Sequence, residues 1–144
     1  MNKFAAQAYR VAFYSDLNAT RFTLGLAEII WAITLLWPGD TFGRPTYAVM
    51  ARVLTEESWG LVFLMSGVMQ WTILFQGSFN DKFAVRFAAW NSVLWWFVVV
   101  SMYLSVSPPP AAISGELSLA IAAFWVYIRS GYMIMGRRST DRGN

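Results

Sequence analysis

Residues 21–37 read RFTLGLAEIIWAITLLW, an apolar run that is long enough to enter a membrane and that has a carboxylate, Glu28, well inside it. A charged side chain at the centre of a membrane helix costs about 2.5–3.5 kcal/mol on insertion scales, so it normally has a partner or a function. Three later apolar runs each contain one strongly polar residue, namely Gln70, Asn91 and Arg129. The pattern predicts a membrane bundle in which these four side chains form one polar layer.

The composition supports lipid rather than water as the solvent of this chain. Of the 144 residues, 57% are hydrophobic, 17% are aromatic and only 13% are charged, and the mean hydropathy is +0.44. A soluble domain of this size carries about 25% charged residues. Aromatic rings are typical of membrane interfaces, where their polar edges reach water. We therefore expect the lipid bilayer to be the main contact of this protein.

The residue types that are missing exclude several kinds of site. The sequence contains no Cys and no His, which excludes disulfides, thiol nucleophiles, Cys/His zinc sites and Ser–His catalysis. No phosphate-binding loop or pair of catalytic carboxylates is present, and the basic residues flank apolar runs instead of forming a nucleic-acid patch. We predict a protein that is not an enzyme, with no metal, no cofactor and no nucleic-acid partner.

The apolar runs predict an all-α fold, an integral membrane bundle of four transmembrane helices with an N-terminal amphipathic helix. Residues 1–144 form a single membrane domain in this prediction, and the boundaries follow from breaks such as Pro38-Gly39 and Pro108 to Pro110. The spans are expected at about 22–37, 59–75, 87–106 and 117–135, and 136–144 are expected to form a short cytoplasmic tail without regular structure.

The N-terminal segment 1–21 carries a basic stripe. On a helical wheel Lys3, Arg10 and Arg21 lie on one narrow face, and apolar residues cover most of the remainder. This pattern is typical of a helix that lies in the membrane interface with its basic face toward anionic head groups. The alternative is a helical extension of the first span that packs on the protein.

The longest polar connection follows the first span. Within it, Thr46–Leu54 is expected to form a short helix whose apolar residues, including Met50, can lie on the membrane surface, and Thr55 is a candidate N-cap for the second span. Such a segment is usually a solvated loop, but it is also the largest surface available to a partner outside the membrane. The charged residues of this candidate surface are Asp40, Arg44, Arg52, Glu56 and Glu57.

The distribution of Lys and Arg predicts the topology, because cytoplasmic loops carry an excess of both. With a cytoplasmic N-terminus, nine basic residues fall on the inner side and only Arg44 and Arg52 fall on the outer side. We therefore expect a bacterial inner-membrane protein with both termini in the cytoplasm. The nine are Lys3, Arg10, Arg21, Lys82, Arg86, Arg129, Arg137, Arg138 and Arg142.

This topology places the four polar residues at similar depths. At about 1.5 Å per helical residue, Glu28, Gln70 and Arg129 each lie about 9 Å from the cytoplasmic ends of their spans, and Asn91 lies about 6 Å from its own. Small residues share their faces, with Gly25 beside Glu28 and Ser118, Ala122 and Trp125 on the face of Arg129. We expect an ion pair between Glu28 and Arg129, with Gln70 and Asn91 satisfying the remaining hydrogen bonds.

Two interpretations of this layer remain open. Polar residues inside membrane bundles commonly join helices, each contributing about 0.6–2 kcal/mol. The functional alternative is a conduction, protonation or ligand site, although a carboxylate paired with Arg is a poor proton carrier because the pair keeps the acid ionised. Arg129 could also extend to the inner interface. The indole N–H of the deeper Trp95 needs a partner, for which the polar layer or a carbonyl is available.

Two stretches resemble a known group. WPGDTFGRPTYAVM at 37–50 and SVSPPPAAISGE at 105–116, together with the layout of four spans, resemble small four-span membrane proteins encoded by tailed bacteriophages. The resemblance implies a phage source and an inner-membrane location, and it carries over no functional residues.

Three classes of function are compatible with the sequence. The first is a non-enzymatic membrane protein that acts through helix assembly or a protein partner, such as a phage-encoded accessory factor, with a homo-oligomer or a membrane-protein partner expected. The second is an oligomeric pore-former of the holin type, and the third is a small channel or transporter subunit. The first is favoured, because the spans have isolated polar groups rather than the continuous polar face of an aqueous pore.

Overall fold

The computed structural model describes residues 16–76, 81–107 and 111–141, and this part of the chain is helical without any strand. The all-α prediction is thus confirmed for the described residues. Each of the four expected spans overlaps one long helix. The elements are α2 (Asp16–Leu36), the 3-10 turn η1 (Pro45–Tyr47), α3 (Ala48–Val53), α4 (Glu56–Gln76), α5 (Asp81–Ser105) and α6 (Ile113–Asp141).

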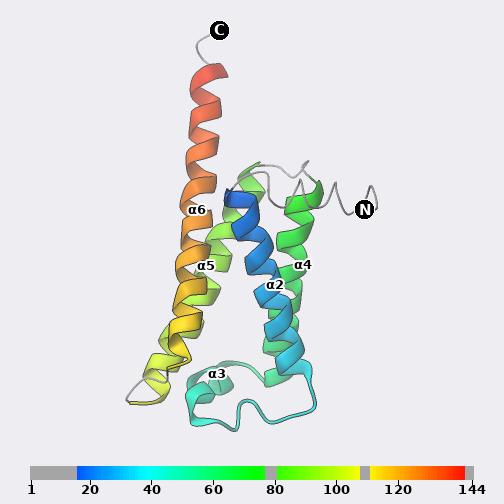
Figure 1. Ribbon diagram of the computed structural model, residues 1–144, viewed down its shortest axis with the longest axis vertical. Coiled ribbons are helices and arrows are strands. Elements are labelled where there is room, and N and C mark those ends of the chain that lie inside the picture. Colours follow the sequence, from blue (N-terminus) through cyan, green and yellow to red (C-terminus); the bar gives the residue numbers. More distant parts are fainter. Residues whose placement is uncertain (1–15, 77–80, 108–110, 142–144) are drawn as a thin grey trace.

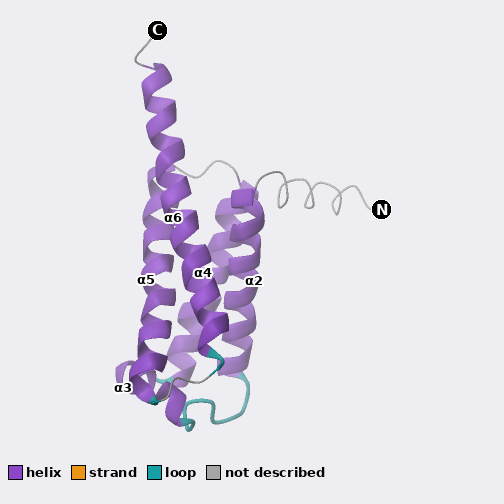
Figure 2. Ribbon diagram, turned by 60° about the vertical axis from the view of Figure 1, so that its left-hand side comes forward, coloured by secondary structure: helices purple, strands orange, loops and turns teal. Residues whose placement is uncertain are grey.

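The four long helices run alternately up and down and associate as two pairs (Figures 1 and 2). The chief partner of α2 is α4, and the chief partner of α5 is α6. We call α2 with α4 the first helix pair and α5 with α6 the second. The short helix α3 lies across one end of the bundle, beside α5 (Figure 1). The opposite end is formed by the start of α2 and the later part of α6, which continues beyond the other helices.

Local chemistry explains where these helices begin and end. The Thr55 hydroxyl accepts a hydrogen bond of 3.3 Å from the Ser58 backbone N–H, which confirms Thr55 as the N-cap of α4. Glu56 and Glu57 then occupy its first turn, where negative charge is favourable for the helix dipole. At the end of α2, Pro38 cannot continue the helical hydrogen bonds, and the chain leaves the helix after Leu36.

Glycine allows the helices of the first pair to approach very closely. A Cβ atom added to Gly67 would lie 2.8 Å from the carbonyl oxygen of Gly25 and 2.8 Å from Cγ1 of Ile29. A Cβ atom on Gly25 would in turn lie 2.7 Å from the indole ring of Trp71. Close approach at small residues is how helices gain van der Waals contact in lipid, where no hydrophobic force drives them together.

The outward faces of the long helices are largely apolar. Large apolar side chains face outward on every long helix, for example Met65 with 72% and Val93 with 68% of their surface exposed, whereas Glu28 and Asn91 are buried. The hydroxyls of the exposed Thr23, Thr34 and Thr72 donate to the carbonyl four residues earlier in their own helix, so they need no water. In the described part of the chain, three helices are long and apolar enough to cross a membrane: Asp16–Leu36, Glu56–Phe75 and Lys82–Ser105.

The short helix α3 closes the end of the bundle instead of lying on the membrane surface. Met50 is fully buried, and its carbonyl oxygen accepts a hydrogen bond of 3.1 Å from the indole N–H of Trp59. The Val49 backbone N–H donates to the Ser105 hydroxyl, at 3.1 Å. The expectation for Met50 is therefore wrong, because the end of the bundle offers this side chain an apolar site and the sequence pattern could not distinguish that site from lipid.

Three helix boundaries lie six residues beyond those expected, namely the start of α2, the start of α5 at Asp81 and the end of α6. The described part of α2 begins at Asp16, so 16–21 belong to the first long helix, as in the alternative in which the N-terminal segment extends the first span. The helix α6 continues to Asp141, so 136–141 are helical rather than an irregular tail. Lys3 and Arg10 of the predicted basic stripe lie outside the described residues, whereas Arg21 lies within α2.

Candidate functional site

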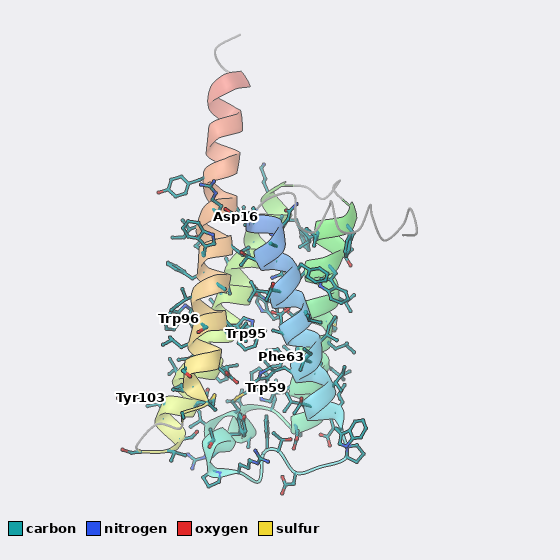
Figure 3. The ribbon with its side chains drawn as sticks, viewed as in Figure 1. Asp16, Trp59, Phe63, Trp95, Trp96 and Tyr103 are labelled. Carbon is teal, nitrogen blue, oxygen red and sulfur yellow. The ribbon has the colours of Figure 1, made fainter. Side chains whose placement is uncertain are left out.

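The fully buried carboxylate of Glu28 is the centre of the site. Its Oε1 atom accepts a hydrogen bond from Nδ2 of Asn91 and one of 3.1 Å from Nε1 of Trp95. The same Asn91 Nδ2 also donates to the Ser66 hydroxyl, at 2.9 Å. Figure 3 shows Trp95 pointing from the second helix pair toward the first. The structure therefore brings Glu28 and Asn91 together, with Trp95 as the indole partner and Ser66 as a member that sequence reasoning missed.

These hydrogen bonds join one helix pair to the other. Glu28 and Ser66 belong to the first pair, and Asn91 and Trp95 belong to the second. A fourth buried hydrogen bond also connects the pairs. In it, Nη2 of Arg21 on α2 donates to the hydroxyl of Ser130 on α6, at 2.7 Å. The polar groups thus provide the directional contacts between two units that each pack closely within themselves.

Gln70 lies near the centre but does not bond to it. Its side chain is buried, and its Cβ atom lies 3.2 Å from the place where a Cβ of Gly25 would stand. Gln70 is therefore level with the helical turn that precedes Glu28 on α2. Its Nε2 atom is buried and has no hydrogen-bond partner.

Arg129 does not pair with Glu28. Its side chain is exposed on the outside of α6, whereas Glu28 is enclosed and bonded to neutral donors. The next residue, Ser130, faces inward and meets Arg21, which is seven residues before Glu28 and so about 10 Å away along α2. The expected ion pair is wrong, and Arg129 lies closer to the end of the bundle than the depth estimate placed it.

The rotation of α6 explains this correction. Its buried strip carries small or neutral side chains, and the strip expected around Arg129 faces outward, with Trp125 half exposed. One residue is a turn of about 100° around a helix, so a serine and an arginine that are adjacent in sequence point in clearly different directions. Burial of Ser130 avoids the high desolvation cost of a second guanidinium. The buried strip consists of Ala120, Ala123, Val126 and Ser130.

Arg21 was missed as a member of the interior. Only 8% of its surface is exposed, and it was expected in an interfacial basic stripe. Its spacing contained a usable signal, because a residue seven positions before Glu28 lies on the same face of a continuous helix. The assumed break at the start of the span concealed this relation.

An aromatic cluster fills the bundle on the α3 side of Glu28. The ring centroids of Trp31 and Phe63 are 5.3 Å apart, and those of Phe63 and Trp95 are 5.4 Å apart. Trp59 and Phe97 extend the cluster as a stacked pair at 5.5 Å. Figure 3 shows Trp59 and Phe63 on the inner side of the first pair, while Trp96 and Tyr103 point outward from the second. The interior is thus polar toward the start of α2 and aromatic toward α3.

Two carboxylates of the candidate outer surface already form hydrogen bonds within the protein. Both oxygens of Glu56 accept backbone N–H groups, from Thr41 at 3.1 Å and Phe42 at 3.3 Å, and the Asp40 carboxylate accepts that of Gly43 at 2.6 Å. These two carboxylates stabilise the loop after α2. The side chains of Arg44, Arg52 and Glu57 remain exposed.

A groove on the side of the bundle lies next to the hydrogen-bonded group around Glu28. A groove of about 340 Å³ between α4 and α5 has the Ser66 side chain in its wall, and its other walls are apolar. A larger groove of about 590 Å³ lies on the outer side of the second helix pair and is lined almost entirely by apolar atoms. Among the described residues, no group of three or more acidic side chains lies together where it could hold a metal ion.

Comparisons with known proteins return no family for this chain: no family model, curated protein or solved structure matches it. Functional interpretation therefore depends on the geometry. A buried carboxylate that is bonded only to neutral donors, with one oxygen unpartnered, can join helices and can also exchange a proton.

Proposed function

We propose that this protein is a non-enzymatic, four-span protein of the bacterial inner membrane that acts as an assembled helix bundle, through other copies of itself or a membrane-protein partner. The observation that carries the proposal is that the buried hydrogen bonds of Glu28, Asn91, Trp95 and Arg21 all connect one helix pair to the other. Polar groups used in this way stabilise the bundle of the chain itself, and the exposed apolar faces of its long helices remain available to other copies or a partner. The resemblance to phage membrane proteins supports an accessory factor encoded by a phage.

The membrane placement follows from charge and apolar surface. Three helices meet the requirements of length and hydropathy for a span, and α6, packed along α5, is the fourth span in this proposal. The excess of Lys and Arg at the end where α2 begins supports cytoplasmic termini.

A pore is the second candidate, and the orientation of the side chains argues against it. Among the described residues, Arg21, Glu28, Gln70 and Asn91 face the interior of a single bundle. The exposed charges, such as Arg86 and Arg129, are isolated among the large apolar side chains of the outward faces. An oligomeric pore needs a continuous polar face on each subunit to line its lumen.

The test is controlled expression in a bacterial host with two versions of the chain that carry different affinity tags. We expect the two versions to co-purify in mild detergent, or one membrane protein to co-purify in a fixed ratio, while growth, dye exclusion and membrane potential stay normal. A monomer without a partner would contradict the assembly proposal. Rapid dye entry would contradict it in favour of the pore.

A further inference from the structure

The unpartnered polar atoms of the interior are confined to one half of the bundle. In the described part of the chain, four buried side-chain atoms lack a hydrogen-bond partner: Nε of Arg21, Oε2 of Glu28, Nε2 of Gln70 and Oδ1 of Asn91. All four belong to the region between Arg21 and the Glu28 layer. A buried polar group without a partner loses the hydration that it had in water, so such atoms call for an additional ligand.

We propose that this polar half of the interior is a water-binding site that connects Glu28 with the end of the bundle where α2 begins. The ligand follows from the mixture of atoms, because two of them are donors, on Arg21 and Gln70, and two are acceptors, on Glu28 and Asn91. A cation would satisfy only the acceptors and an anion only the donors. Water satisfies both, and buried waters typically make about three hydrogen bonds.

The polar side chains form a continuous series toward that end. Glu28 and its layer come first, Gln70 follows one turn away beside Gly25, and Arg21 with Ser130 comes after a further turn. Arg21 is only five residues, or about 8 Å, from the first residue of α2. A short chain of water molecules is therefore sufficient to span the distance.

The other half of the interior prevents passage in the opposite direction. The rings of Trp31, Phe63 and Trp95 are in mutual contact, with centroids 5.3–6.1 Å apart, and Met50 of α3 is fully buried at the end of the bundle. Interiors packed by apolar groups stay dry. Glu28 is consequently reached by water from one side.

Because water reaches Glu28 from one side, its carboxylate can exchange a proton with the solution at the Arg21 end of the bundle. In this step a hydronium ion loses a proton to Oε2 of Glu28 and leaves a water molecule, so atoms and charge balance. The described side chains that face this region from α4, α5 and α6 are Ser66, Gln70, Asn91, Trp95 and Ser130, none of which titrates, and Arg21 is the charged group on α2 itself.

The water site rests on the fold alone, whereas the statement that it faces the cytoplasm rests on the proposed function. The natural chain has no Cys, so single cysteines report local access to water. Gln70→Cys and Ser130→Cys probe the polar half. Ser101→Cys is the matched control, because Ser101 is equally enclosed but lies beyond Trp95 toward α3.

The experiment measures the reaction of each folded variant in detergent with a small hydrophilic methanethiosulfonate, after circular dichroism and gel filtration have shown an unchanged fold. The thiolate forms a disulfide with the reagent and releases a sulfinate. We expect Gln70→Cys and Ser130→Cys to react at least tenfold faster than Ser101→Cys. Equal rates for all three cysteines, whether fast or slow, would overturn the proposal.

A second variant tests the route. Arg21→Leu in the Gln70→Cys background replaces the polar entrance by an apolar side chain, and we expect the reaction to slow at least tenfold. Arg129→Leu removes an exposed cation from α6 and is the control that leaves the rate unchanged. An unchanged or faster reaction with Arg21→Leu would contradict entry past Arg21.

Membrane vesicles separate the water site from the proposed topology. With an impermeant reagent, we expect Gln70→Cys to react in inverted vesicles and to remain protected in right-side-out vesicles. The reverse pattern would leave the water site valid and overturn the cytoplasmic placement of the termini. Reaction from both sides would overturn one-sided access.

Discussion

Glu28 is held by neutral donors. Asn91 and Trp95 both donate to one oxygen of its carboxylate, and both come from the helix pair to which Glu28 does not belong. Hydrogen bonds to a charged group contribute about 1.5–3 kcal/mol, and removing one partner from a buried site leaves the other with an unmet desolvation cost. The contribution of each donor to the stability of the bundle can therefore be measured one atom at a time.

Trp95→Phe removes the indole N–H and keeps most of the ring. We expect it to lower the free energy of unfolding by about 1–3 kcal/mol, because Oε1 of Glu28 loses a donor. Trp96→Phe is the matched control, since Trp96 faces outward and is 39% exposed, and its cost should stay within about 0.5 kcal/mol. Unfolding of both variants by SDS in mixed micelles, followed by far-UV circular dichroism, checks the difference. Equal stabilities would show that the hydrogen bond contributes nothing.

The composition of the polar layer could be predicted only in part. Glu28 and Asn91 were expected to meet, because the alternation of helix directions and the positions of both residues depend only on well-marked spans. Whether Arg129 or Ser130 faces the interior could not be predicted in the same way, because it depends on how α6 is rotated about its own axis. That rotation is set by the packing of small residues such as Ala123 against α5, which a single sequence does not reveal.

At the scale of the helices, glycine determines how closely the first pair packs. The backbone of α2 passes so near Gly67 that an added methyl group would contact a carbonyl oxygen and the Ile29 side chain at 2.8 Å each. Backbone atoms cannot move aside as a flexible side chain can. A larger residue at this position must separate α2 from α4.

Gly67→Ala is therefore expected to destabilise the bundle by about 1–3 kcal/mol, the usual cost of overpacking. Gly131→Ala is the control, because nothing lies within 4 Å of the added Cβ on α6. There the better helix propensity of alanine should stabilise the protein by up to about 1 kcal/mol. SDS unfolding of the two variants gives opposite shifts if this is correct, and a neutral Gly67→Ala would contradict the close contact.

The helices themselves were largely predictable, whereas their ends were not. The apolar runs at 59–75 and 87–106 each fall on one helix, α4 and α5, and both runs end within one residue of the observed helix end, whereas the helices begin three and six residues earlier than expected. The start of α2 was placed at least six residues too late, because the span was taken to begin after the charge of Arg21. In the structure the Arg21 side chain has an internal partner, Ser130, so its charge does not require the helix to begin after it.

At the scale of the whole molecule, the described long helices form two pairs that are joined by polar bonds and aromatic rings. The proposed orientation can be tested at this scale, again because the chain has no native Cys. We expect Gly39→Cys, in the exposed loop after α2, to be labelled by an impermeant maleimide in intact spheroplasts. Arg86→Cys, which is exposed near the start of α5, should be labelled only after permeabilisation. The opposite result for both positions would invert the topology.

The bonds between the helix pairs also impose an order on biosynthesis. Asn91 is 63 residues and Trp95 is 67 residues downstream of Glu28. At about 5–20 residues per second, a ribosome that has just added Glu28 needs roughly 3–13 s to reach Asn91. During this time α2 has neither of the donors that the finished protein supplies to its carboxylate. Since each donor comes from α5, a nascent chain that ends after α4 lacks both of these donors for Glu28, and only the completion of α5 supplies them.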